Sequence, residues 1–214
     1  SDSAILNKKS GFPTPDSRFL IPDTKNMILP TTYMGPVEWY RQFLANPSAV
    51  QIEVMESFPK QTYRNRCTIT LPHDSQSNCQ SPIANSLTLT VPVKRVDSKQ
   101  FTRDVEISYQ KRWQHQHWIA LMSAYKRTPY FDYYADFFRP FYEQETRFLV
   151  DLNEKIHEVI IRLIANDAKG EEAKRLLGEN RTTDWQGMDL EPCFGNGQSI
   201  LDILFEYGPE SVMK

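Results

Sequence analysis

The sequence predicts an α/β fold, in which a small mixed sheet begun by a Rossmann-like βαβ unit precedes a largely helical C-terminal half. Two observations predict this fold. Short runs in the first half of the chain alternate between apolar and polar residues, as strands do, whereas apolar residues recur with helical spacing in the second half. The chain has 214 residues, of which 40% are hydrophobic, so it is long enough to bury a sizeable core.

The chain divides into a short arm and one larger unit. Residues 1–26 are polar and carry several prolines, so we expect them to form an irregular N-terminal arm. We expect residues 27–214 to form a single α/β domain, sheet-rich over residues 27–110 and helical over residues 111–214. The sequence contains no internal repeat that would divide this domain further.

A βαβ unit opens the domain. The pattern of apolar residues predicts a strand at residues 27–29, a helix at residues 36–45 and a second strand at residues 50–54. Pro47 ends the helix, because the residue before a proline avoids the helical conformation. The alternation in the second strand predicts one buried face and places Glu53 on the polar face. The two strands should be parallel with a right-handed crossover.

Three further strands are expected. Residues 87–93 alternate most clearly, and Pro92 indicates that this strand ends there or lies at an edge. A short strand is expected at residues 105–107, and a longer one at residues 62–70. In the longer strand, one face would carry Tyr63, Asn65, Cys67 and Ile69, and the other Arg64, Arg66, Thr68 and Thr70.

The second half of the chain reads as helices over residues 112–127, 130–142 and 149–165. A short buried helix follows Ser199, which is a favourable N-cap residue, and stops at Gly208. The second of these helices holds an aromatic stripe with helical spacing, namely Tyr130, Tyr134, Phe137 and Phe141. Two interpretations of the stripe are open, because these rings could form core or could stack on a sugar ring.

Composition and charge exclude several classes of protein. The net charge of −2 argues against general nucleic-acid binding, which needs excess lysine and arginine, but a local basic cluster could still bind a small polyanion. No apolar run is long enough for a transmembrane helix, and the first ten residues lack an apolar signal core. Three cysteines without a CxxC pair suit a reducing compartment, so we expect a cytoplasmic protein. P-loop, GxSxG, HExxH and GxGxxG motifs are absent.

The pair Arg64 and Arg66 is the first candidate site. On a strand, both side chains would project from the same face about 7 Å apart. Arginine binds phosphate or carboxylate groups bidentately, and Lys60 and Gln61 add donors just upstream, so the group is a candidate anion site. The alternative is that these arginines pair internally with glutamates, such as Glu53 and Glu56.

His117 is the candidate general acid or base. On a helix, His115 and His117 lie about 200° apart, so they cannot both bind one metal ion, and we expect no metal site. His117 borders the buried face of its helix and is either catalytic or a hydrogen-bonded structural histidine. Cys67 could be a nucleophile, but free cysteine in a strand is more often a small buried hydrophobe.

Several segments, in order along the chain, resemble one known family. The most distinctive is Tyr-Arg-Asn-Arg-Cys at residues 63–67. The others lie at residues 29–40, 87–93, 113–118, 123–125, 129–134, 151–153, 199–205 and 208–210. Together they make the chain similar to the WbqC-like protein family over nearly its whole length after residue 26.

This resemblance implies a transferase in surface polysaccharide biosynthesis of the O-antigen type. The transferase would bind a small anionic molecule, such as a nucleotide, a sugar phosphate or an acyl donor. We expect no nucleic-acid partner and no membrane insertion. A homodimer is possible, and no cofactor is specified. His117 would be the catalytic acid or base. The residues expected to bind substrate are Lys60, Gln61, Tyr63, Arg64, Asn65, Arg66, Tyr33 and Trp118.

The chain departs from the family pattern near its C-terminus. Gln186 stands where an arginine is expected, and the aromatic segment before the last helix is shortened to residues 193–198. An alternative to the transferase is therefore a non-catalytic member of the family that binds a ligand or a partner.

Overall fold

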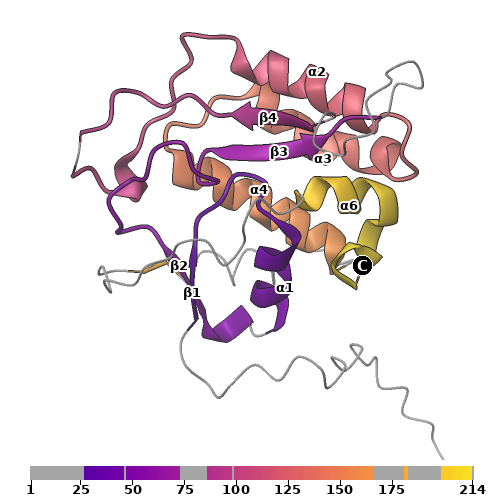
Figure 1. Cartoon of the computed structure of the whole chain (residues 1–214), viewed down its shortest axis with the longest axis horizontal. Helices are drawn as coiled ribbons and strands as arrows, with labels where there is room; N and C mark the ends of the chain where they lie inside the picture. Colours follow the sequence, from indigo (N-terminus) through magenta and orange to yellow (C-terminus); the bar gives the residue numbers. More distant parts are fainter. Residues whose placement is uncertain are drawn as a thin grey trace, which may run out of the picture.

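The computed structural model describes residues 27–45, 47–72, 86–97, 99–165, 181–182 and 199–213. The arm predicted at residues 1–26, Gln186 and the shortened segment at residues 193–198 lie outside them. The strands are β1 (Met27–Pro30), β2 (Val50–Glu53), β3 (Arg66–Thr70) and β4 (Ser86–Thr90). The α-helices are α1 (Val37–Ala45), α2 (Trp113–Tyr125), α3 (Phe131–Glu143), α4 (Leu149–Ile164) and α6 (Ile200–Tyr207). The α/β class and the mostly helical second half are confirmed (Figure 1).

The opening βαβ unit is confirmed. β1 and β2 are parallel, with Met27 opposite Val50 and Pro30 opposite Glu53, and α1 connects them. The indole N–H of Trp39 on α1 donates to the carbonyl of Pro30 at 2.8 Å and ties the helix to the end of β1. The loop between β1 and α1, residues 31–36, is buried throughout, which is unusual for a connection of this kind.

β3 and β4 form a second, separate pair, which is antiparallel, with Arg66 opposite Thr90. The strand predicted at residues 62–70 is wrong over its first four residues. Gln61 has a left-handed φ of 65°, and Asn65 N donates to Thr62 O at 3.2 Å, so the chain makes a turn before β3 begins. The strand predicted at residues 87–93 ends at Thr90, before the proline. The segment at residues 105–107 forms single β-bridges instead of a strand.

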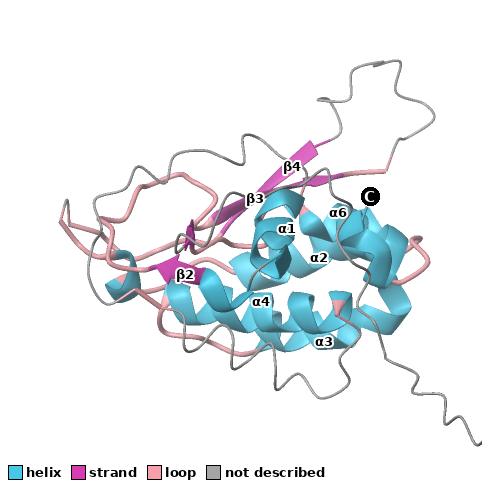
Figure 2. Cartoon of the chain, turned by 90° about the horizontal axis from the view of Figure 1, so that it is seen from below, coloured by secondary structure: helices cyan, strands magenta, loops and turns pink. Residues whose placement is uncertain are grey.

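The helices lie to one side of the β3–β4 pair (Figure 2). The N-cap of α6 is confirmed, because the Ser199 hydroxyl accepts from Leu201 N at 3.3 Å. Gly208 ends that helix with a left-handed φ of 60°, and a Cβ there would lie 2.5 Å from the Tyr130 ring. No helix among the described residues is both long and apolar enough to cross a membrane.

The predicted aromatic stripe on α3 has the wrong register. The buried aromatic residues of α3 are Phe131, Phe138 and Tyr142. The ring centroids of Phe131 and Phe138 lie 5.4 and 5.6 Å from that of Phe205 on α6. The predicted stripe lies on the flank of the helix and is half-buried or exposed. With so many aromatic residues in one helix, more than one stripe has helical spacing, so periodicity alone could not select the buried one.

Candidate functional site

The turn at residues 60–65 packs against the buried loop that follows β1. Tyr33 N donates to Tyr63 O at 2.8 Å, which joins the two segments through their backbones. Lys60 and Gln61 are exposed at the tip of the turn, and Lys60 Nζ donates to Val96 O at 3.3 Å. Of the predicted binding residues in this segment, Tyr63 is therefore held next to Tyr33.

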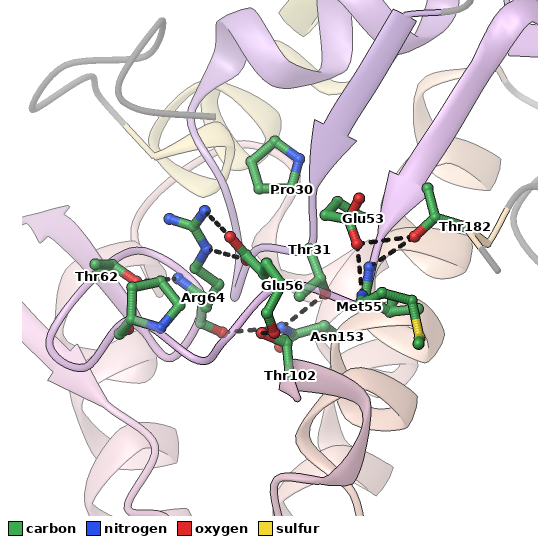
Figure 3. A network of polar contacts seen from close by, with 12 residues as sticks. Pro30, Thr31, Glu53, Met55, Glu56, Thr62, Arg64, Thr102, Asn153 and Thr182 are labelled. Carbon is green, nitrogen blue, oxygen red and sulfur yellow. Dashed lines mark hydrogen bonds and ion pairs between the residues drawn. The ribbon is translucent and has the colours of Figure 1, made fainter. Parts of the chain in front are cut away.

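Arg64 is buried in this turn and faces Glu56 (Figure 3). Its Nε donates to Glu56 Oε1 at 2.8 Å and its Nη2 donates to Oε2 at 2.9 Å, while the guanidinium lies 5.0 Å from the Tyr63 ring. The internal pairing considered as the alternative is therefore confirmed for Arg64. The prediction that Arg64 and Arg66 share one strand face is wrong, because Arg64 precedes the strand.

The ion pair with Arg64 does not return the pKa of Glu56 to its ordinary value. Burial raises the pKa of this carboxyl, although the hydrogen bonds and charge of Arg64 act in the opposite direction. The Glu56 backbone is also fixed, because its carbonyl accepts from Thr102 N at 2.9 Å. Arg64 and Glu56 thus form one rigid bidentate unit beneath the turn.

Glu53 at the end of β2 is fully buried, so the prediction that it lies on a polar face is wrong. Residues 181–182 run alongside β2 and bring the Thr182 hydroxyl to Glu53 Oε1 at 2.9 Å (Figure 3). The Met55 amide donates to the same oxygen. Glu53 Oε2 has no hydrogen-bond partner among the described residues. The carboxyl ends of the parallel strands therefore carry two buried acidic side chains, Glu53 and Glu56, of which Glu56 is paired with the Arg64 guanidinium.

Three successive side chains of the loop after β1 contact three polar side chains of the helical half. Asn153 Nδ2 donates to Thr31 Oγ1 at 3.1 Å and to Arg64 O at 2.9 Å. The next loop residue, Thr32, contacts a histidine of α4 through its hydroxyl, at 3.2 Å. The third, Tyr33, contacts His117 of α2 at 2.8 Å. We call these contacts, made by Thr31, Thr32 and Tyr33 with Asn153, His157 and His117, the polar seam.

His117 is buried and has polar partners on two other segments. The Tyr33 hydroxyl contacts its Nδ1, and the ring also hydrogen-bonds to the backbone of Thr90. Burial lowers the pKa of His117 to about 4, against the opposing effect of Thr90, so the imidazole is neutral at pH 7. This arrangement is typical of a structural histidine, and the catalytic role of His117 stays a prediction.

His157 repeats the arrangement and was not identified from the sequence. Its Nδ1 contacts the Tyr40 hydroxyl at 2.6 Å, and its ring stacks on Trp39 with centroids 4.3 Å apart. Burial lowers its pKa to about 3. The available signal was its spacing: Asn153 and His157 are four residues apart within the apolar face predicted for this helix, where a polar side chain needs a partner.

Two further candidate residues, Trp118 and Cys67, lie among aromatic side chains and in the core, respectively. Trp118 is half-buried, and its ring centroid lies 5.7 Å from that of Tyr142. Cys67 is buried on β3, and burial raises the pKa of its thiol well above the ordinary range. A protonated, buried thiol matches the interpretation of Cys67 as a small hydrophobe.

Arg66 differs from Arg64 in having no acidic partner among the described residues. It begins β3, lies on the strand face that also carries the exposed Thr68 and Thr70, and is itself half-buried. Its Nε is buried without a hydrogen-bond partner in the described part of the chain. The neighbouring Asn65 donates from Nδ2 to Val91 O at 3.0 Å, whereas its Oδ1 likewise has no partner there.

These features define an α/β protein whose parallel strand pair ends in a buried, charged cluster. The next strand begins with an arginine that has no acidic partner within the described residues. The chain belongs to the WbqC-like protein family, whose pattern matches residues 36–193. The resemblance inferred from the sequence is thereby confirmed. Comparison with curated proteins and with solved structures found no match.

Proposed function

We propose that this protein is a transferase of surface polysaccharide biosynthesis that binds an anionic sugar-linked or nucleotide-linked substrate through Arg66. Membership of the WbqC-like family supports the general role. The observation that carries the binding step is the guanidinium of Arg66, which is half-buried and has no acidic partner among the described residues. A cation that is partly desolvated and unpaired gains most from an incoming phosphate or carboxylate.

Arg64 has a different role in this proposal. A substrate that took over its guanidinium would leave Glu56 buried without its partner, and losing one partner of a buried pair costs about 3–5 kcal/mol. We therefore assign Arg64 and Glu56 to holding the turn at residues 60–65 in place. Lys60 and Gln61, which are exposed on that turn, are the supporting donors for the anion.

The second candidate function is ligand binding without catalysis. It is favoured by the state of His117, which is buried, neutral and engaged by both Tyr33 and the Thr90 backbone. A residue in this state would have to break those bonds before it could exchange a proton with a substrate. We assign His117 to positioning Tyr33.

A thermal-shift screen tests the binding step. UDP, UDP-glucose, glucose 1-phosphate and acetyl-CoA are suitable probes, because they span the nucleotide, sugar phosphate and acyl donor classes. A probe at about 100 times its dissociation constant adds about 2.7 kcal/mol to the free energy of unfolding. We expect at least one probe to raise the melting temperature of the natural chain, and Arg66→Gln to remove the shift.

Arg127→Gln is the matched control, because Arg127 is an exposed arginine just beyond α2. It should keep the full shift. If no probe raises the melting temperature, or if Arg66→Gln responds as the natural chain does, the binding proposal is wrong. Recovery of a bound donor chemically unchanged after incubation with the protein would favour the non-catalytic candidate.

A further inference from the structure

An open pocket lies where three short backbone segments run side by side, and Arg66 is not part of its lining. Ile107 forms a β-bridge with Val93, and Glu106 forms one with Phe148. Ile107 N also donates to Arg147 O at 2.9 Å, so the segments are fixed to one another. The pocket has a volume of about 610 Å³, which is in the range of small-molecule sites. Its lining includes Lys94, Glu106, Tyr109, Gln110, Glu145 and Arg147.

The charges of this pocket neutralise one another. Glu106 lies between two cations, accepting from Lys94 Nζ at 2.6 Å and from Arg147 Nη2 at 2.8 Å. These contacts, that of Lys94 first, lower the pKa of Glu106 and keep it ionised. With Glu145 the pocket holds two cations and two carboxylates, so its formal charge is zero. It therefore offers no net attraction to a phosphate or to a metal ion.

The pocket nevertheless presents many hydrogen-bonding groups on a rigid frame. Arg147 has five N–H donors, of which Glu106 occupies two. Gln110 and Glu145 are exposed at the pocket and add an amide and a carboxylate. Tyr109 has its hydroxyl bound to the Thr146 backbone, donating to O at 2.9 Å and accepting from N at 2.8 Å. What Tyr109 still offers a ligand is the apolar surface of its ring.

We propose that this pocket binds a neutral sugar residue. A sugar ring carries several hydroxyls, each both donor and acceptor, which match the amide, carboxylate and guanidinium groups around Glu106. Its C–H face is apolar and packs on an aromatic ring such as that of Tyr109. Within the proposed transferase, the bound sugar is the acceptor for the group carried by the anionic donor. That acceptor role rests on the proposed function, whereas sugar binding by the pocket does not.

Saturation-transfer NMR on the full chain tests the proposal. The probes are the methyl glycosides of glucose, galactose, mannose and N-acetylglucosamine. We expect at least one of them to receive saturation from the natural protein. Replacing two exposed groups together, Gln110→Ala with Glu145→Ala, should weaken its binding at least tenfold while leaving the backbone frame intact. The matched control, Gln116→Ala with Glu206→Ala, removes an exposed amide and carboxylate elsewhere and should bind as the natural chain does.

The proposal is overturned if no glycoside receives saturation, if the pocket variant binds as well as the control, or if Arg66→Gln abolishes the saturation signal. Binding of inorganic phosphate in the pocket, detected as a loss of affinity in the same double variant, would also contradict a neutral ligand. Glycoside binding without any response to nucleotides or sugar phosphates would support the pocket and remove the proposed function. The two proposals therefore fail separately.

Discussion

Two buried polar regions lie side by side in this fold and differ in charge. The polar seam is neutral, because burial keeps His117 and His157 unprotonated, and each ring contacts a tyrosine hydroxyl. The cluster at the ends of β1 and β2 holds the Arg64–Glu56 ion pair and the buried side chain of Glu53, whose Oε2 has no partner among the described residues. Figure 3 shows the charged cluster with Asn153, which joins it to the seam.

The two kinds of buried polar group contribute differently to stability. The neutral bonds of the seam fix the loop after β1 against α2 and α4, and each is worth about 1 kcal/mol in net stability. The charged pair has a large desolvation cost, so its members are strongly interdependent. Breaking the pair should therefore cost more than breaking any single bond of the seam.

The largest effect is expected from removing one member of the buried ion pair. Arg64→Met leaves Glu56 without its guanidinium and should lower the free energy of unfolding by about 3–5 kcal/mol. Adding Glu56→Leu removes the stranded carboxylate and should recover most of that loss. Urea unfolding of the two single variants and the double variant measures the coupling. Strictly additive losses would show that the two residues do not act as a pair.

The seam should make the free energy of unfolding fall as the pH is lowered, because its two histidines are buried in the neutral form. The unfolded chain protonates its histidines below about pH 6.5, whereas His117 and His157 bind protons only near pH 4 and pH 3 in the folded state. Their contribution is therefore fully present above pH 6.5 and is lost as the pH falls toward 4. The raised pKa of Glu56 works against this trend.

We expect His157→Phe to flatten the decline in the free energy of unfolding between pH 6.5 and pH 4, by an amount of the order of a few kcal/mol. Urea unfolding at a series of pH values provides the measurement. His115→Gln is the control, because His115 is exposed on the opposite side of α2 and should leave the slope unchanged. An unchanged slope in His157→Phe would mean that this imidazole is not kept neutral by burial.

A smaller effect is expected from a single tyrosine hydroxyl of the seam. Tyr40→Phe removes the partner of His157 Nδ1 and leaves a buried ring nitrogen without that hydrogen bond, which should cost about 1–3 kcal/mol. Tyr133→Phe makes the same change at a side chain that is 74% exposed and should cost almost nothing. Equal melting temperatures for the two variants would remove the energetic role of the Tyr40–His157 bond.

The sequence predicted the parts of this fold that depend on local patterns. The β1–α1–β2 unit, the span of α2 and the Ser199 cap follow from apolar spacing and capping chemistry, and all three are confirmed. The turn before β3 was missed because β-type residues continue through it, and its position depends on Arg64 reaching Glu56 from another segment. Such long-range pairing leaves no local pattern.

The same reason explains what was missed at the site. The alternation of apolar and polar residues predicted that Glu53 faces solvent. In the structure it is covered by Thr182, which is far away in the sequence. Likewise, Asn153 and His157 find their partners in the loop after β1, and both partners lie more than a hundred residues earlier in the sequence. The internal pairing of Arg64 with Glu56 could be named from the sequence only as one of two alternatives, and the fold was needed to separate Arg64 from Arg66.

Comparing variants of Arg64 and Arg66, which are two residues apart, is the most direct test of which arginine binds the anion. Arg66→Gln should leave the free energy of unfolding within about 0.5 kcal/mol of the natural value, because no acidic partner among the described residues is lost, and should abolish the thermal shift given by the anionic probe that the natural chain binds. Arg64→Met with Glu56→Leu should retain that shift. The opposite result, with binding lost in the Arg64 variant and kept in Arg66→Gln, would contradict the assignment of Arg66 as the anion-binding residue.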